Sequence, residues 1–261
     1  MTLRTVTVTR YVTPLREGGS LPAIVEADDD GIYVLKFRGA GQGPKALIAE
    51  LVAGEIARAA GLPVPEIVFA ELDPELARTE PDPEIQALIR ASAGLNLALD
   101  YLPGSVMFDV AAGDRVDADL ASRAVWFDAF VTNVDRTARN PNLLCWHKNV
   151  YFIDHGAALY FHHAWRNLEE AAWSRFSPIR QHLLLRWASR IEEVNEELRR
   201  RLSRAMFADI LDQAPDAWLL PEIGAETPAA KRAAYVEYLS ERLDSASEFV
   251  EEAIRARAQL V

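Results

Sequence analysis

The sequence has very little cysteine. Cys145 is the single cysteine in 261 residues, which excludes an intramolecular disulfide. It stands between Leu144 and Trp146 in an apolar run, so we expect it to be a small core residue rather than a reactive thiol. A fold of this length must therefore be held together by its core.

Long apolar runs are also missing. No run approaches the roughly 20 residues that a membrane-spanning helix needs. The N-terminal residues lack the apolar stretch of a secretory signal. We therefore expect a cytoplasmic protein with no membrane partner.

Positive charge is in deficit. The chain has 28 Lys and Arg against 39 Asp and Glu, which gives a formal net charge of −11. Binding to nucleic acid or to anionic membranes depends on basic surfaces that release counterions or attract headgroups. The charge balance therefore argues against a nucleic-acid partner.

What is present is enough apolar material for a large core, since half of the residues are hydrophobic. Residue patterning predicts strands in the first part of the chain and mainly helices in the second, which is the α+β class. The expected strands are residues 5–13, 21–27, 32–37, 67–72 and 95–102, with one helix at 44–60 and a solvated loop at 73–84. A turn at Asp28 to Gly31, with glycine supplying the positive φ, makes the early strands an antiparallel sheet. The expected later elements are helices at 119–134, 179–211 and 229–259 and a hairpin of residues 143–146 and 150–153.

Four polar residues stand at the end of the helix 119–134 and at the two ends of the hairpin: Asp135, Asn140, Asn142 and Asp154. If the hairpin turn centres on Lys148, Asn142 and Asp154 lie opposite each other. An amide oxygen and a carboxylate there suit Mg²⁺, which prefers hard oxygen ligands and takes others from substrate phosphates. Asp135 is then placed to accept a proton from a hydroxyl, and the set fits phosphoryl transfer.

Two asparagines, Asn140 and Asn142, are alternatives for the second metal ligand. Protein kinases separate the catalytic Asp from a metal-binding Asn by four residues. Asp135 and Asn140 have that spacing, whereas the hairpin geometry favours Asn142.

Lys36 shares one face of its predicted strand with Ile32 and Val34. An unpaired ammonium on an apolar face is costly, so we expect a carboxylate or phosphate partner. A rival chemistry is a metal-dependent hydrolase in which His155, His162 and His163 join Asp154 around zinc. Adjacent side chains such as those of the last two histidines are expected to diverge, which argues against that site.

Three segments carry a resemblance to a known family. The segments Val64-Pro65, Asp135-Arg136 and Ile153-Asp-His-Gly-Ala-Ala-Leu159 resemble the HipA-like kinases, and Asn133-Val-Asp135-Arg136 resembles the catalytic loop of phosphatidylinositol kinases. The resemblance implies a bilobal protein-kinase-like fold, with an antiparallel-sheet N-lobe at residues 1–102 and a helical C-lobe at 103–261. It also implies ATP with Mg²⁺, and a Ser/Thr-type hydroxyl acceptor that is often on a protein.

The resemblance assigns further residues to the site. Lys36 would grip the ATP phosphates, with Glu50 as its ion-pair partner and Glu55 in reserve. Asp100, Tyr101 and Leu102 would form the hinge that binds adenine, and Arg136 or Arg139 would stabilise the transferred charge. Gly18 and Gly19 take the place of the phosphate-covering loop, although they depart from the full glycine pattern, and Gly39, Gly41 and Gly43 are rivals. A pseudokinase that binds nucleotide without transfer is the alternative.

Overall fold

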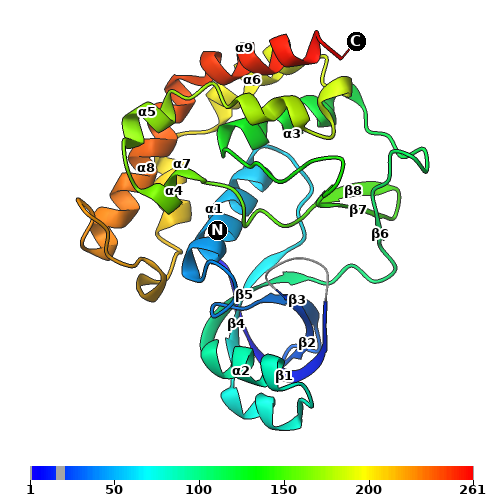
Figure 1. Cartoon of the computed structure of the whole chain (residues 1–261), viewed down its shortest axis with the longest axis vertical. Coiled ribbons are helices and arrows are strands. Elements are labelled where there is room, and N and C mark those ends of the chain that lie inside the picture. Colours follow the sequence, from blue (N-terminus) through cyan, green and yellow to red (C-terminus); the bar gives the residue numbers. More distant parts are fainter. Residues whose placement is uncertain (1, 16–20, 261) are drawn as a thin grey trace.

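The computed structural model describes residues 2–15 and 21–260, and it places a β-barrel at one end and helices at the other (Figure 1). The barrel strands run in the order β1-β2-β3-β5-β4. Every pairing is antiparallel except that of β1 with β4, which is parallel and closes the barrel. The strands are β1 (Thr5–Pro14), β2 (Ala23–Ala27), β3 (Ile32–Lys36), β4 (Ile67–Leu72) and β5 (Gly94–Asp100).

The barrel interior follows from the alternation of apolar and polar residues. Val6 and Val8 of β1 are buried in it, while Thr7 between them faces outward. In the turn before β3 the positive φ belongs to Asp30 (61°) rather than to Gly31, which corrects our expectation. Gly31 is needed for space, because a Cβ there would lie 2.6 Å from the hydroxyl of Tyr33.

Residues 73–84, predicted as a loop, contain a 3-10 helix (Pro74–Thr79) and the start of α2 (Pro83–Ala91). Asp73 and Asp82 cap these helices, because each accepts a hydrogen bond from the backbone amide two residues later. Each Asp is followed by Pro at the first helical position. This Asp-Pro pattern is typical of the start of a helix, whereas we predicted a loop from it. Helix α2 buries its isoleucines in the core of the barrel.

The second part of the chain is mainly helical, which confirms the predicted α+β class. The two long helices expected at 179–211 and 229–259 are each divided. Ser203 caps the helix Arg204–Leu211 by accepting from the Met206 amide, and Ser245 separates the helix Pro228–Asp244 from the helix Ala246–Arg257. The helices are α3 (Ala118–Phe130), α4 (Phe161–Ala164), α5 (Leu168–Ala172), α6 (Ile191–Arg201), α7 (Arg204–Leu211), α8 (Pro228–Asp244) and α9 (Ala246–Arg257), with 3-10 turns at Ser177–Gln181, Leu185–Trp187 and Asp216–Trp218.

A small sheet of β6 (Val106–Met107), β7 (Leu143–Trp146) and β8 (Asn149–Phe152) lies beside the helices. The hairpin turn consists of His147 and Lys148, both with positive φ (47° and 68°), as a two-residue turn requires. The register therefore differs by one residue from our prediction, and the Ile153 amide donates to the Asn142 carbonyl. Asn142 does not stand directly opposite Asp154.

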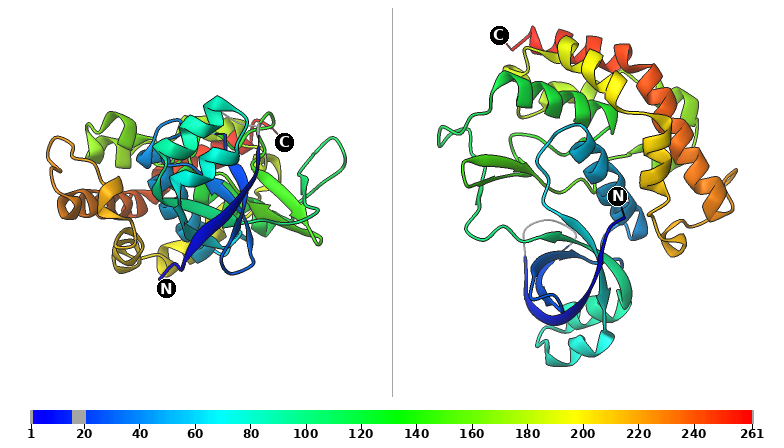
Figure 2. Two further views of the ribbon diagram at one scale, coloured as in Figure 1. Left: turned by 90° about the horizontal axis from the view of Figure 1, so that it is seen from below. Right: turned by 180° about the vertical axis from the view of Figure 1, so that it is seen from behind.

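Helix α1 (Pro44–Ala59) connects the two parts. It follows the barrel strand β3 in the chain, yet its apolar residues belong to the same buried cluster as α3, α7 and α9. Figure 2 shows α1 and the β7–β8 hairpin between the barrel and helices α3, α6 and α9. No helix in the described ranges is long and apolar enough to cross a bilayer.

Candidate active site

Lys36 joins three elements at one ammonium. Its Nζ lies 2.9 Å from Oε2 of Glu50 on α1 and 2.5 Å from Oδ1 of Asp154, which follows β8. The side chain of Glu50 is fully buried, that of Lys36 is 13% exposed, and that of Asp154 is 44% exposed. The lysine therefore has the carboxylate partner that we expected, and the triad opens to solvent on the Asp154 side.

The triad holds its charges strongly. Burial by itself would lower the pKa of Lys36, but the carboxylates of Glu50 and Asp154 outweigh it and raise that pKa above its usual value. Burial would likewise raise the pKa of Glu50, but the ammonium of Lys36 and the contact with His155 hold it well below its usual range. A fixed ammonium next to a solvent-facing carboxylate results.

His155 is part of the support of this triad. Its backbone amide donates to Glu50 Oε2 at 2.9 Å, and its Nδ1 lies 3.3 Å from Glu50 Oε1. His162 and His163 are elsewhere, with their Nε2 atoms 3.2 Å apart, so our expectation that these rings diverge was wrong. Within the described residues, no three His, Cys, Asp or Glu side chains form a group that could hold a metal. The three histidines therefore do not form one site.

Asp135 lies on the loop after α3. The loop begins where Thr132 takes a positive φ of 53°, and Asn133 Oδ1 accepts from the Asp135 amide at 3.1 Å. Asp135 Oδ2 accepts from Nδ2 of Asn140 at 2.7 Å and, more weakly, from Nδ2 of Asn142 at 3.4 Å. Both amide groups thus turn their nitrogen toward Asp135 and keep the oxygen for another ligand.

The open end of the hairpin has the donor set that Mg²⁺ prefers. Asn142 and Asp154 both adopt left-handed backbone conformations (φ 48° and 57°), and the bond between Asn142 and Ile153 holds their segments together. Asn142 Oδ1 and Asp154 Oδ2 accept no hydrogen bond from any residue that the structure describes. One amide oxygen and one carboxylate oxygen remain for a hard cation, so the residues fit the metal.

Asp128 on α3 is the centre of a buried network that our sequence analysis missed. Its Oδ2 accepts from Nε of Arg136 at 2.6 Å and from Nε2 of His182 at 2.8 Å, and its Oδ1 accepts from Asn133 at 2.8 Å. Burial would raise the pKa of Asp128, but Arg136 and His182 outweigh it and lower the pKa. His182 Nδ1 accepts from the Leu184 amide, so the proton of the neutral ring sits on Nε2. A charged residue inside an apolar helix face was the available signal.

Arg136 has a different position from the one we expected. The residue is 1% exposed, and its Nη1 donates to the Asn142 carbonyl at 2.5 Å. Its guanidinium points inward to Asp128, so it links the Asp135 loop to the hairpin instead of facing a transferred phosphate. Arg139, by contrast, is exposed on the loop.

The predicted hinge follows the end of β5. The amides of Asp100 and Tyr101 already donate to the carbonyls of Glu66 and Ile32. The Leu102 amide makes no hydrogen bond to the described part of the chain, so it is the free donor of this segment.

Two glycine segments were candidates for the phosphate-covering loop. Gly18 and Gly19 lie outside the described residues. The rival segment packs against the barrel, because the Gly39 amide donates to Ser92 Oγ, and a Cβ on Gly39 would lie 2.9 Å from that oxygen. It leads directly into α1.

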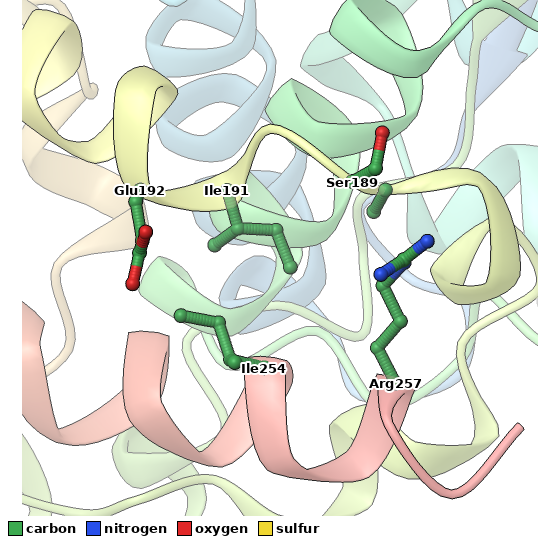
Figure 3. Close-up of a pocket in the computed structure, with 6 residues that line it drawn as sticks. Ser189, Ile191, Glu192, Ile254 and Arg257 are labelled. Carbon is green, nitrogen blue, oxygen red and sulfur yellow. The ribbon is translucent and has the colours of Figure 1, made fainter. Parts of the chain in front are cut away.

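A surface pocket elsewhere shares no residue with this site. It lies between the start of α6 and α9 (Figure 3). Its labelled lining residues are Ser189, Ile191, Glu192, Ile254 and Arg257.

Comparison with solved structures shows the fold that the chain adopts. The crystal structure of the Helicobacter pylori proinflammatory kinase CtkA aligns over 100% of both chains, with a TM-score of 0.50 and 14% identity. The Golgi casein kinase aligns over 98% of this chain and 73% of its own, with a TM-score of 0.48 and 10% identity. The chain has a protein-kinase-like fold.

The profile of the HipA-like kinases matches residues 8–251. The chain therefore belongs to the HipA-like kinase family. The search of curated proteins gave no significant match.

Proposed function

We propose that this chain is a Mg²⁺-ATP-dependent phosphotransferase that moves the γ-phosphate of ATP to a hydroxyl, a serine or threonine side chain of a protein. The contact of Lys36 with both Glu50 and Asp154 carries the proposal. It joins the barrel, α1 and the hairpin end around one fixed positive charge. Phosphoryl transfer is catalysed mainly by such positioning and charge stabilisation.

In this mechanism each residue has one task. Lys36 neutralises the ATP phosphates, and the free amide of Leu102 is the adenine donor at the hinge. Asn142 and Asp154 are the Mg²⁺ ligands, and the bound ion would supply charge neutralisation at the phosphates. Asp135 orients the acceptor hydroxyl and takes its proton.

The two asparagines divide the work between them. Asn142 is bonded through its backbone to Ile153, next to Asp154, whereas Asn140 donates to Asp135 at 2.7 Å. We therefore assign Asn142 to the metal and Asn140 to the orientation of Asp135.

Replacing Asp135 by asparagine tests the transfer step. The variant keeps the side-chain volume but cannot accept a proton, so transfer of labelled phosphate should fall by about 100-fold or more while ATP affinity is retained. Asp212→Asn, at an exposed position after α7, is the matched control. Full transfer by Asp135→Asn would show that Asp135 is not the base.

Calorimetric titration of ATP with and without Mg²⁺ tests the nucleotide site. We expect magnesium-dependent binding in the wild type and its loss in Asp154→Asn. Binding without any transfer would favour the nucleotide-binding pseudokinase. Absence of ATP binding by the wild type would contradict the proposed cleft.

A further inference from the structure

Lysine is rare in this chain. It occurs at positions 36, 45, 148 and 231 only, among 28 basic residues. Lys36 belongs to the site described above, and Lys148 lies in the exposed hairpin turn. Lys45 and Lys231, which are distant in sequence, approach the same oxygen, Oε1 of Glu222, at 2.7 Å and 3.5 Å.

Positive charge exceeds negative charge at this point. Helix α1 begins at Pro44-Lys45 with no side-chain cap and no acidic residue in its first turn, so its positive end adds to the two ammonium groups. Among the described residues, Glu222 is the one anion that contacts either lysine. One carboxylate therefore faces two lysines and a helix terminus.

The other titratable groups near Lys45 and Lys231 do not supply a second negative charge. Burial lowers the pKa of His162 and of His163, and burial raises the pKa of Tyr235, so these groups are neutral at pH 7. They are held to one another by side-chain contacts of 3.0 Å and 3.2 Å.

The excess of positive charge is clearest at Lys231. Its side chain is 2% exposed, and Nζ lies 3.6 Å from the centre of the Trp165 ring. Nζ makes no hydrogen bond of good geometry to the described residues. An ammonium has three donors, and leaving them unbonded in a buried place is costly. The position suits a ligand with several oxygens.

Glu222 is carried by a loop that can release it. A tight turn between Glu222 and Ala225 holds the loop internally, with backbone bonds of 3.2 Å and 2.9 Å. Ile223 is 95% exposed and Leu220 is 51% exposed, so these side chains do not anchor the loop to the core. Ala225, which is 1% exposed, keeps the turn packed in the core, while the Glu222 side chain is 25% exposed and can rotate away from the lysines toward solvent.

We propose that Lys45 and Lys231 form a second anion site, separate from the nucleotide cleft, that takes a phosphate-type dianion in place of Glu222. A dianion balances both ammonium groups, and its oxygens accept the donors of Lys231. Lys45 also donates to the His162 carbonyl at 2.6 Å, and it lies on the same helix as Glu50. An anion bound to Lys45 would therefore lie near the segment of His162, which follows Asp154 in the chain.

The scarcity of lysine makes the test direct. Protein labelled with ¹³C at lysine Cε gives four side-chain signals, which Lys→Met variants assign. Titration with inorganic phosphate should shift the Lys45 and Lys231 signals saturably and leave Lys148 unmoved. Lys36 reports separately on the nucleotide cleft, so a failure of the proposed kinase function does not affect this result.

Glu222→Gln removes the competing carboxylate and should tighten phosphate binding by about tenfold. Glu226→Gln, on the same loop, should not change the phosphate affinity, because the one partner that Glu226 has among the described residues is the Gly224 amide. Loss of binding is expected in Lys231→Met, and Lys45→Met, at a less buried position, gives the same test if that variant fails to fold.

Titration with N-acetyl-phosphoserine amide distinguishes the source of the dianion. Tighter binding than inorganic phosphate indicates a phosphorylated side chain, and weaker binding indicates free phosphate. Either result supports the site. Equal phosphate affinity in Glu222→Gln and the wild type, or a shift of Lys36 alone, would overturn it.

Discussion

Replacing Asp128 by asparagine should strongly destabilise the protein. Asp128 accepts hydrogen bonds from Arg136, His182 and Asn133, and none of the four side chains is more than slightly exposed. Asparagine has one acceptor oxygen and turns an NH₂ group toward donors, which leaves the Arg136 charge buried without a counterion. Breaking one side of a buried ion pair costs about 3–5 kcal/mol, a fall in Tm on the order of 10 °C for a chain of this size.

Chemical and thermal unfolding followed by circular dichroism measures this cost. Asp119→Asn is the control, because Asp119 is 37% exposed in its pairs with Arg123 and Arg190, and such pairs contribute less than about 1 kcal/mol. The folded-state pKa of Asp128 is lowered, so its contribution is complete above the unfolded pKa, about 4, and is lost as pH falls through the folded value. If Asp128→Asn lowered the free energy of unfolding by no more than Asp119→Asn does, the reasoning would be refuted.

Two further predictions concern the histidine cluster and the metal ligand. The folded-state pKa of His162 is well below that of an unfolded histidine. The free energy of unfolding of the wild type should therefore fall by about 1.4 kcal/mol per pH unit as pH decreases below about 6.5. The free energy of unfolding of His162→Gln should depend less steeply on pH, with a residual slope from His163, whose pKa is also lowered, whereas His147→Gln, in the exposed hairpin turn, should keep the full slope. Asn142→Ala should weaken the Mg²⁺ dependence of ATP binding, while Asn140→Ala should spare that binding and slow transfer. The opposite pattern in calorimetry and transfer assays would exchange the two roles.

Several local patterns predicted the structure correctly. Alternation in β1 buries Val6 and Val8. The helix expected at residues 44–60 ends at Ala59, just before Gly61 takes a φ of 85°. Lys36 has the carboxylate partner that was expected, although Ile32 on the same face of β3 is 42% exposed and the buried face of the strand is that of Tyr33 and Leu35. The capped helices after Asp73 and Asp82 show that the same local signals can also be misread.

The hairpin register shows where local reading failed. A two-residue turn needs two positive φ values, and His147 and Lys148 supply them although neither is the glycine or asparagine that marks such turns. Because the register differs by one residue, Asn142 pairs with Ile153 instead of Asp154. The two segments that carry the proposed metal ligands are nevertheless adjacent.

By itself, the sequence determined the α+β class, the polar residues of the site and the need of Lys36 for a counterion, because periodicity and burial cost act between near neighbours. The family resemblance implied Glu50 as the partner of Lys36, but only the tertiary structure decided that Asp154 shares that lysine. Likewise, only the tertiary structure decided that Asp128 binds Arg136 and that Lys45 and Lys231 share Glu222. These contacts depend on how α1, α3 and α8 pack into one core. Side chains that are distant along the chain leave no local pattern that records whether they touch.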